Sequence, residues 1–154
     1  YGTVTGVQTC ALPIFQSVLR WAMDTFNMKK FKKIMKGLDW AKFYDEYHEK
    51  VLDIKAMEKQ IIDLIGDDEI QKQQGIIPYV LTGDEHYLDL RAFPDKIKLA
   101  VWEKQNHKCA ICGKEFDYQF MEGDHISPWR DGGRTEVKNC QMLCRECNRR
   151  KGSK

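Results

Sequence analysis

Two pairs of closely spaced cysteines carry the clearest chemistry in the sequence. They are Cys109 and Cys112 in "CAICG", and Cys144 and Cys147 in "CRECNRRKG". A Cys-x-x-Cys turn can aim two sulfurs at one point, and four thiolates in two such turns suit tetrahedral Zn²⁺. Two close pairs favour a metal site over a disulfide framework, and therefore a reducing, cytoplasmic setting. The sequence predicts one structural zinc held by all four cysteines.

An acid and a histidine stand side by side between these pairs, in "GDHISPW". On an extended strand, Asp124 and His125 would point to opposite faces, so they should not serve each other as partners. A neutral imidazole can accept a proton near pH 7, and a carboxylate can hold a hard divalent cation. Taken alone, the pair reads better as a surface acid and a loop histidine, so its surroundings decide the interpretation.

The segments "CAICG", "GDHISPW", "NCQMLC" and "CNRRKG" together resemble the zinc-bound HNH endonuclease family, over residues 91–154. The resemblance implies a ββα-metal fold that hydrolyses phosphodiester bonds in DNA. It implies that His125 is the general base and that Asn139 holds the loop that orients it. Asp124 and Asn148 would be the protein ligands of one catalytic cation, Mg²⁺ or another divalent ion. Many members have histidine at the position of Asn148, and asparagine is a variant that the family also shows.

Phosphodiester hydrolysis calls for these groups on chemical grounds too. The reaction needs an activated water, neutralised charge on the phosphoryl oxygens and help for the leaving oxygen. A cation with only two protein ligands keeps positions open for phosphate and water. A zinc ion held by four cysteines is closed and cannot do this. We therefore expect two metals with separate duties.

Positive charge gathers near the second cysteine pair. Residues 16–99 hold 14 basic and 15 acidic side chains, whereas residues 100–154 hold 11 and 8. Basic residues beside the cysteines would suit phosphate contacts on DNA. The candidate nucleic-acid contacts are Arg145, Arg149, Arg150, Lys151 and Lys154, with Arg130 and Arg134 from the intervening loop.

The elements that must position these residues follow in order through residues 91–154. A helix is expected over Pro94–Lys108, followed by the first cysteine turn. A strand is expected over Tyr118–Glu122, with Asp124 and His125 at or just past its end. The loop "SPWRDGGRT", a second strand "NCQMLC" and a short helix complete a strand–loop–strand–helix order.

Residues 16–90 are expected to form a helical segment, so the fold class is α+β. Helices should end at Gly37 and Gly66, with Asp39 as an N-cap between them. A shorter helix is expected over "DDEIQKQQG", and then a connector with Pro78 and Gly83 as breakers. The segment resembles the region before HNH modules in some bacterial multidomain proteins with a ParB-like nuclease domain. That resemblance implies a role in restriction or defence against foreign DNA.

The first residues do not resemble the rest of the chain. "VTGVQTCALPI", residues 4–14, has no charge and resembles a translated sequencing-library adapter. We take residues 1–15 as a non-native tail joined to a truncated gene, so Cys10 leaves the cysteine count and an upstream domain is missing. An ordinary apolar N-terminal strand is the alternative.

Composition narrows the remaining choices. The chain is 42% hydrophobic and 31% charged with no long uncharged apolar run, so no membrane span is expected. Two rivals to a DNA endonuclease stay open. One is a zinc-stabilised nucleic-acid-binding module without catalysis, and the other is an RNA-cleaving nuclease of the same fold.

Overall fold

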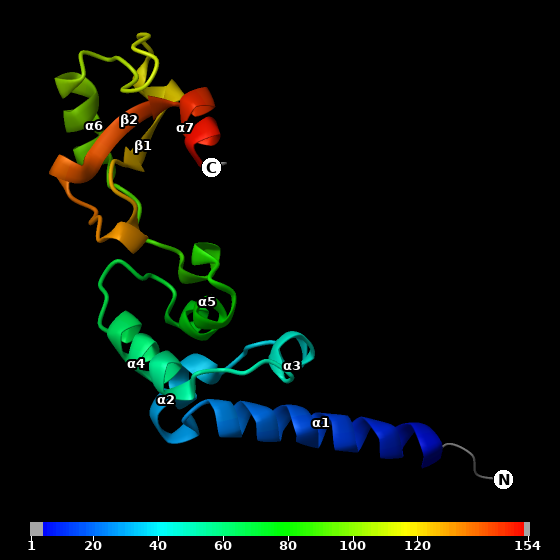
Figure 1. The fold of residues 1–154 in the computed structure, drawn as a ribbon. Helices are drawn as coiled ribbons and strands as arrows, with labels where there is room; N and C mark the ends of the chain where they lie inside the picture. Colours follow the sequence, from blue (N-terminus) through cyan, green and yellow to red (C-terminus); the bar gives the residue numbers. More distant parts are fainter. Residues whose placement is uncertain (1–4, 153–154) are drawn as a thin grey trace. The chain divides into compact units, whose positions relative to one another are not determined.

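The computed structural model describes residues 5–152, with side chains from residue 12 onward. It divides into two compact units, an N-terminal unit ending at Leu90 and a C-terminal unit beginning at Arg91. The N-terminal unit contains α1 (Thr5–Thr25), α2 (Met28–Met35), α3 (Trp40–Tyr47), α4 (Ile54–Ile65) and α5 (Ile76–Thr82) (Figure 1). The C-terminal unit contains α6 (Asp95–Lys104), β1 (Met121–His125), β2 (Cys140–Cys144) and α7 (Arg145–Gly152). The α+β class is confirmed.

Side-chain caps begin three of the N-terminal helices. The carboxylate of Asp39 accepts a hydrogen bond from the Lys42 backbone N–H at 3.2 Å, which confirms Asp39 as the N-cap of α3. Asn27 and Asp53 cap α2 and α4 in the same way. Buried apolar side chains then hold the helices together, namely Phe26, Phe31, Ile34, Met35, Phe43, Ile61, Ile76, Ile77 and Leu88.

The expected helix over "DDEIQKQQG" is wrong. Its only helical part is a 3₁₀ turn, Gln73–Gly75. Ile70 is buried and forms an isolated antiparallel bridge with Leu90, which keeps the backbone before that turn extended. Tertiary pairing has overridden the local helix preference.

The expected connector after Gly75 is also partly wrong, because it contains α5. Pro78 lies in the first turn of α5, where the missing N–H would have no helical partner. Gly83 does end the helix, at a left-handed φ of 76°.

The first helix begins at Thr5, earlier than the expected helical segment, and it includes Pro13. Leu12, Ile14 and Phe15 are exposed on it. The identification of residues 1–15 as a non-native tail stays a prediction. Within residues 5–152, no helix combines the length and hydrophobicity that a membrane crossing requires.

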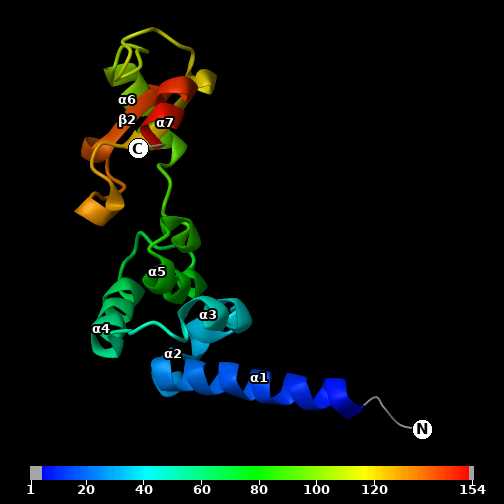
Figure 2. The same cartoon turned by 45° about the vertical axis from the view of Figure 1, so that its right-hand side comes forward.

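The C-terminal unit is built on an antiparallel pair of strands. Asp124 lies opposite Gln141, and His125 lies opposite Cys140. Figures 1 and 2 show α6 and α7 beside this pair. The expected strand over Tyr118–Glu122 is displaced, because Tyr118–Phe120 is a 3₁₀ turn and β1 pairs residue for residue with β2. Asp124 and His125 are the last two residues of β1, so they lie at its end, as expected, and within it rather than past it.

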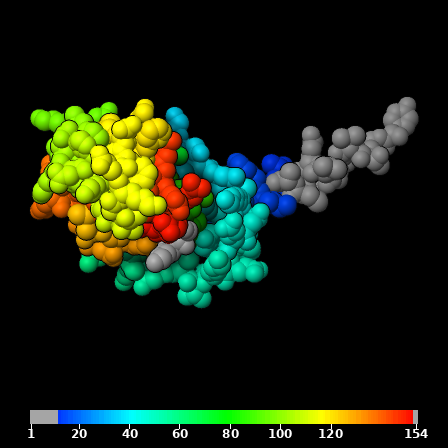
Figure 3. All heavy atoms as spheres, turned by 90° about the horizontal axis from the view of Figure 1, so that it is seen from above, coloured from blue at the N-terminus to red at the C-terminus, as the bar shows by residue number. Residues whose placement is uncertain are grey.

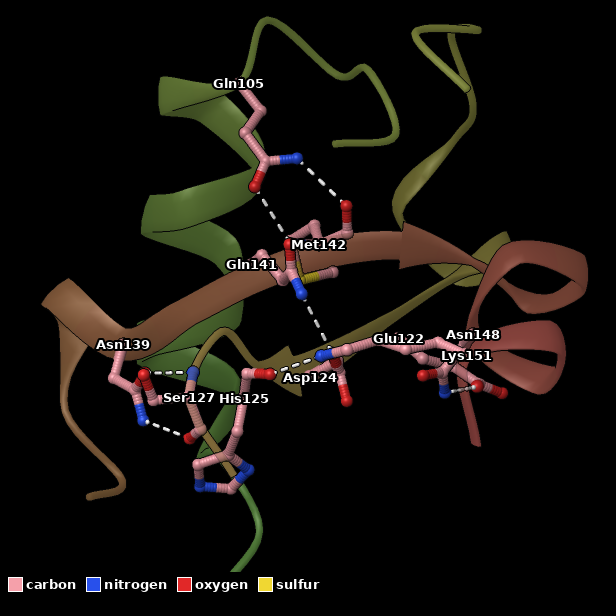
Figure 4. Close-up of polar contacts among 10 residues, drawn as sticks. All are labelled: Gln105, Glu122, Asp124, His125, Ser127, Asn139, Gln141, Met142, Asn148 and Lys151. Carbon is pink, nitrogen blue, oxygen red and sulfur yellow. Dashed lines mark hydrogen bonds and ion pairs between the residues drawn. The ribbon is translucent and has the colours of Figure 1, made fainter. Parts of the chain in front are cut away.

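A glutamine joins the predicted helix α6 to β2. The Gln105 side chain donates to the Met142 carbonyl and accepts from the Met142 N–H, both at 2.9 Å (Figure 4). Beside this link lie buried side chains of Phe93, Val101, Met121, Met142 and Leu143. The hairpin is thus fixed to the helix by backbone-like hydrogen bonds and by a small apolar core.

Candidate zinc site and active site

The four predicted zinc ligands come together. The sulfur atoms of Cys109, Cys112, Cys144 and Cys147 all lie within 4.8 Å of one another. Four sulfurs at about 2.3 Å from a tetrahedral Zn²⁺ would be about 3.8 Å apart, so the cluster has the size that zinc requires. Cys112 is exposed, whereas the other three cysteines are buried.

A tight turn and the start of a helix aim these sulfurs at one point. The Gly113 N–H donates to the Cys109 carbonyl at 2.9 Å, and Gly113 has a left-handed φ of 69°. The Ala110 N–H donates to the Met142 carbonyl at 3.1 Å, which attaches the turn to β2. Cys144 ends β2 and Cys147 lies in the first turn of α7, as the sequence predicts.

The acidities of the thiols suit a cation between them. Burial disfavours the Cys109 thiolate, but backbone N–H groups of Cys112, Cys144 and Ile111 outweigh it and lower the pKa of Cys109 to about 6. Burial and the neighbouring cysteines raise the pKa of Cys147 to about 11. Four thiolates this close repel one another, so a bound Zn²⁺ would supply the charge that lets all four ionise.

The fifth cysteine of this region stands apart from the cluster. Burial and the nearby Asp124 carboxylate raise the pKa of Cys140 to about 11. Cys140 is buried on β2 and is absent from the four-cysteine group. It is a small core residue, as expected.

Asn139 holds the loop between the strands at three points. Its Oδ1 accepts from the Ser127 N–H at 2.8 Å, and its Nδ2 donates to the carbonyls of Ser127 and Arg134 at 3.1 and 2.9 Å. The side chain is nearly buried at 9% exposure. A Cβ atom on Gly133 would lie 1.8 Å from the Ser127 carbonyl oxygen, so only glycine allows the loop to close this tightly.

Asp124 faces α7 and is bound on two sides. Gln141 Nε2 donates to Asp124 Oδ2 at 2.9 Å from the opposite strand. The Lys151 ammonium group donates to the same oxygen and to the His125 carbonyl, the latter at 2.5 Å (Figure 4). The Lys151 ammonium group thus lies at the carboxylate that the family resemblance assigns to a metal.

His125 points to the other face of β1, as alternation requires. Its ring lies 4.3 Å from the Phe93 ring, centroid to centroid, and its Nε2 lies 3.1 Å from Thr135 Oγ1. Phe93 precedes α6, and Thr135 lies in the loop after β1. The side chains of Asp124 and His125 therefore contact different residues, although Lys151 binds both the Asp124 carboxylate and the His125 backbone carbonyl.

Asn148 contacts a residue that sequence reasoning missed. Its Nδ2 donates to Glu122 Oε2 at 2.6 Å (Figure 4). Glu122 and Asp124 share one face of β1, and Asn148 and Lys151 share one face of α7. Because the Asn148 side-chain N–H donates to Glu122, its side-chain carbonyl oxygen is the atom that could act as a ligand of a cation. Glu122 lies two residues before Asp124, and on a strand this spacing predicts that both side chains lie on the same face.

The basic residues of α7 have contacts within the unit. Arg145 donates to the Gln119 carbonyl at 3.0 Å, and Arg150 lies 3.5 Å from the Cys147 sulfur. Arg130, Arg134 and Arg149 are exposed. In the space-filling view α7 (red) lies against the yellow surface around β1 (Figure 3). Lys154 lies outside the described residues.

A family model described as HNH endonuclease matches residues 109–154. The match begins at the first zinc ligand and includes Asp124, His125, Asn139 and Asn148. No curated protein and no solved structure matches the chain. Together, the family match and the four converging cysteines are consistent with a zinc-bound HNH domain at residues 109–154.

Proposed function

We propose that this HNH domain is a metal-dependent endonuclease that hydrolyses phosphodiester bonds in DNA. One observation carries the proposal. The Asp124 carboxylate, which binds the Lys151 ammonium group, and the His125 imidazole lie on adjacent residues of β1. Asn139 holds the loop that follows the strand. A structural zinc module would need none of these three features.

The residues at Asp124 suit a divalent cation. The Lys151 ammonium stands in for it at the carboxylate, and the Asn148 amide can turn an oxygen outward while Glu122 holds its nitrogen. Carboxylate and amide oxygens are the ligands that hard cations prefer. When bound there by Asp124 and Asn148, a cation such as Mg²⁺ would supply positive charge to the phosphate and to the leaving oxygen.

The imidazole of His125 would act as the general base. It would take a proton from water as the water oxygen forms a bond to phosphorus and the bond to the leaving sugar oxygen breaks. The Phe93 contact restricts the ring, and Asn139 restricts the loop beyond it. His125 and Asn139 are thus assigned as base and loop holder.

Exposed basic groups would hold the nucleic acid. Arg130, Arg134, Arg145, Arg149 and Arg150 are all exposed, so they are candidates for phosphate contacts. Lys151 would exchange part of its internal contacts for phosphate, and Lys154 would extend the same basic segment. We also propose a cytoplasmic setting, because reduced thiols are needed for the zinc site. The role in defence rests only on the resemblance of the helical segment.

A nicking assay tests the proposal. Supercoiled plasmid should be nicked by the chain with Mg²⁺ or Mn²⁺, and both EDTA and His125→Ala should abolish nicking. Equal inertness of the wild type and His125→Ala, with both still binding DNA, would instead favour a non-catalytic binding module. Faster cleavage of matched RNA would favour an RNA nuclease.

A further inference from the structure

Glu122 lies on β1 and directs both of its carboxylate oxygens at side chains of α7. Its Oε2 accepts a hydrogen bond from Asn148 Nδ2 at 2.6 Å, and its Oε1 lies 4.0 Å from Arg145 Nε. Arg145 and Asn148 are three residues apart, so they lie on one side of the helix. Arg145 also donates to the Gln119 carbonyl at 3.0 Å, just before β1. These contacts hold the Glu122 carboxylate against the start of α7.

The chemistry of the pair decides which end of the Asn148 amide faces Glu122. A carboxylate oxygen only accepts hydrogen bonds, and so does the oxygen of an amide. Turning the amide by 180° would therefore place two acceptors in contact. The orientation in the structure instead gives a short hydrogen bond to a charged acceptor. The side-chain oxygen of Asn148 is thus held facing away from Glu122.

This held oxygen belongs to the same region as the Asp124 carboxylate. Glu122 and Asp124 lie on one face of β1, because they are two residues apart on a strand. Asn148 and Lys151 lie on one side of α7, because they are three residues apart on a helix. Glu122 contacts Asn148, and Asp124 contacts Lys151, so two neighbouring pairs join the strand to the helix.

We propose that Glu122 is a positioning residue that keeps the side-chain oxygen of Asn148 available as a ligand of the divalent cation. It acts through Asn148 and is not itself a ligand, because its two oxygens are directed at Asn148 and Arg145. The role rests on the proposed nuclease function, which assigns Asp124 and Asn148 to the cation. Without Glu122 the amide could turn its nitrogen to the site, and a nitrogen that carries two hydrogens cannot bind a cation.

The contact is exposed enough to be removed without loss of the fold. The side chains of Arg145 and Glu122 are 62% and 47% exposed, and Asn148 is partly buried. Exposed polar pairs of this kind contribute little to stability. Substitutions of Glu122 should therefore leave the zinc content and the melting temperature of the chain near those of the wild type.

Isothermal titration of the zinc-loaded chain with Mn²⁺ tests the positioning role without requiring activity. Glu122→Ala should weaken Mn²⁺ binding about tenfold. Glu122→Gln should recover most of this loss, because its amide oxygen can accept the same N–H of Asn148. Glu103→Ala removes an exposed carboxylate from α6 and should bind Mn²⁺ like the wild type. Asp124→Asn should remove most of the binding, which identifies the site that is titrated.

A double-mutant cycle separates positioning from direct binding. Asn148→Ala removes the amide, so it should weaken Mn²⁺ binding at least as much as Glu122→Ala does. Adding Glu122→Ala to Asn148→Ala should then have no further effect, because Glu122 has no amide left to hold. A carboxylate that bound the cation, or attracted it by charge alone, would cost the same factor in both backgrounds.

Nicking rates give a second readout of the same role. At a limiting Mn²⁺ concentration Glu122→Ala should nick supercoiled plasmid about tenfold more slowly than the wild type. Saturating Mn²⁺ should restore most of the rate, because the defect lies in the affinity for the cation and the base His125 is unchanged. His125→Ala should stay inactive at every Mn²⁺ concentration.

Three results would overturn the positioning role. They are wild-type affinity for Mn²⁺ in Glu122→Ala, an equal loss in both backgrounds of the cycle, and a Glu122→Gln variant as weak as Glu122→Ala. A wild type that binds no Mn²⁺ would overturn the positioning role and the nuclease proposal together. The expected pattern of affinities in a wild type that does not nick would support the role of Glu122 and count against the nuclease function alone.

Discussion

The zinc site and the candidate active site share one pair of strands and one helix, yet they are built in opposite ways. The candidate zinc site has four identical donors, three of them buried, which would fill the tetrahedral shell of a bound Zn²⁺. The candidate active site combines three partly exposed groups of different kinds: the Asp124 carboxylate and the His125 imidazole lie on two faces of β1, and the Asn148 amide lies on α7. The first arrangement can only stabilise, whereas the second leaves room for a substrate.

The two sites are nevertheless coupled through α7. Cys147 is one of the four candidate zinc ligands and Asn148 is the next residue, so a zinc ion bound there would fix where α7 begins and where Asn148 points. Changes at the zinc site should therefore remove both fold and activity. Changes at the active site should remove activity and leave the fold, and this asymmetry can be tested.

The largest effect is expected from Cys109→Ser. Structural zinc in small domains contributes about 10–16 kcal/mol, comparable to or larger than the whole stability of an ordinary domain. The C-terminal unit should therefore fail to fold, with loss of bound zinc and of its cooperative melting transition. Cys140→Ser is the matched control, because Cys140 is buried and lies outside the four-sulfur cluster. An unchanged melt and zinc content in Cys109→Ser would refute the structural role of zinc.

The second-largest effect is expected from Asp124→Asn, which should lower activity without changing stability. Asp124→Asn keeps the size of the side chain and removes the negative charge that would hold the cation. Nicking should fall by about a hundredfold or more, while the melting temperature and the zinc content should stay near those of wild type. Asp131→Asn, in the exposed loop, should nick normally. If Asp124→Asn lost zinc as well, the two sites would not be separable.

The sequence predicted the two sites to different extents. The cysteine cluster was predicted from the spacing of its four members, whereas Asp124 and Asn148 were assigned from the family resemblance that the motifs carry. The contacts of Thr135 with His125 and Arg91 were not predicted, because they join residues 10 and 44 positions apart in the sequence. No local pattern encodes such a contact. Glu122 was within reach, since strand alternation places it beside Asp124.

The same reason explains the errors in the N-terminal unit. The segment around Ile70 has polar, helix-compatible residues, but its bridge to Leu90 depends on a partner well along the chain. Pro78 was treated as a helix breaker, although a proline in the first turn costs no hydrogen bond. Motif-based prediction thus served the four-cysteine cluster better than it served the helices of the N-terminal unit.

A moderate effect on stability is expected from Asn139→Ala. The change leaves the Ser127 N–H and two carbonyls without the amide that they share, and it should lower the free energy of unfolding by about 3 kcal/mol. Asn139→Asp keeps the acceptor but loses both donated hydrogen bonds, so it should be no more stable than Asn139→Ala. Chemical denaturation of the zinc-loaded protein measures both. Stability equal to wild type in both variants would mean that the loop does not depend on Asn139.

The smallest effect should come from Lys151→Met, and its sign is informative. The ammonium group competes with a divalent cation for Asp124, in a pair whose side chains are 33% and 24% exposed. Such a partly exposed ion pair contributes no more than about 1 kcal/mol, so its removal should tighten Mn²⁺ binding by up to about fivefold. Affinity for DNA should fall at the same time if Lys151 also contacts phosphate. Isothermal titration with Mn²⁺ alone separates these effects, and weaker Mn²⁺ binding would show that Lys151 supports the cation site rather than occupying it.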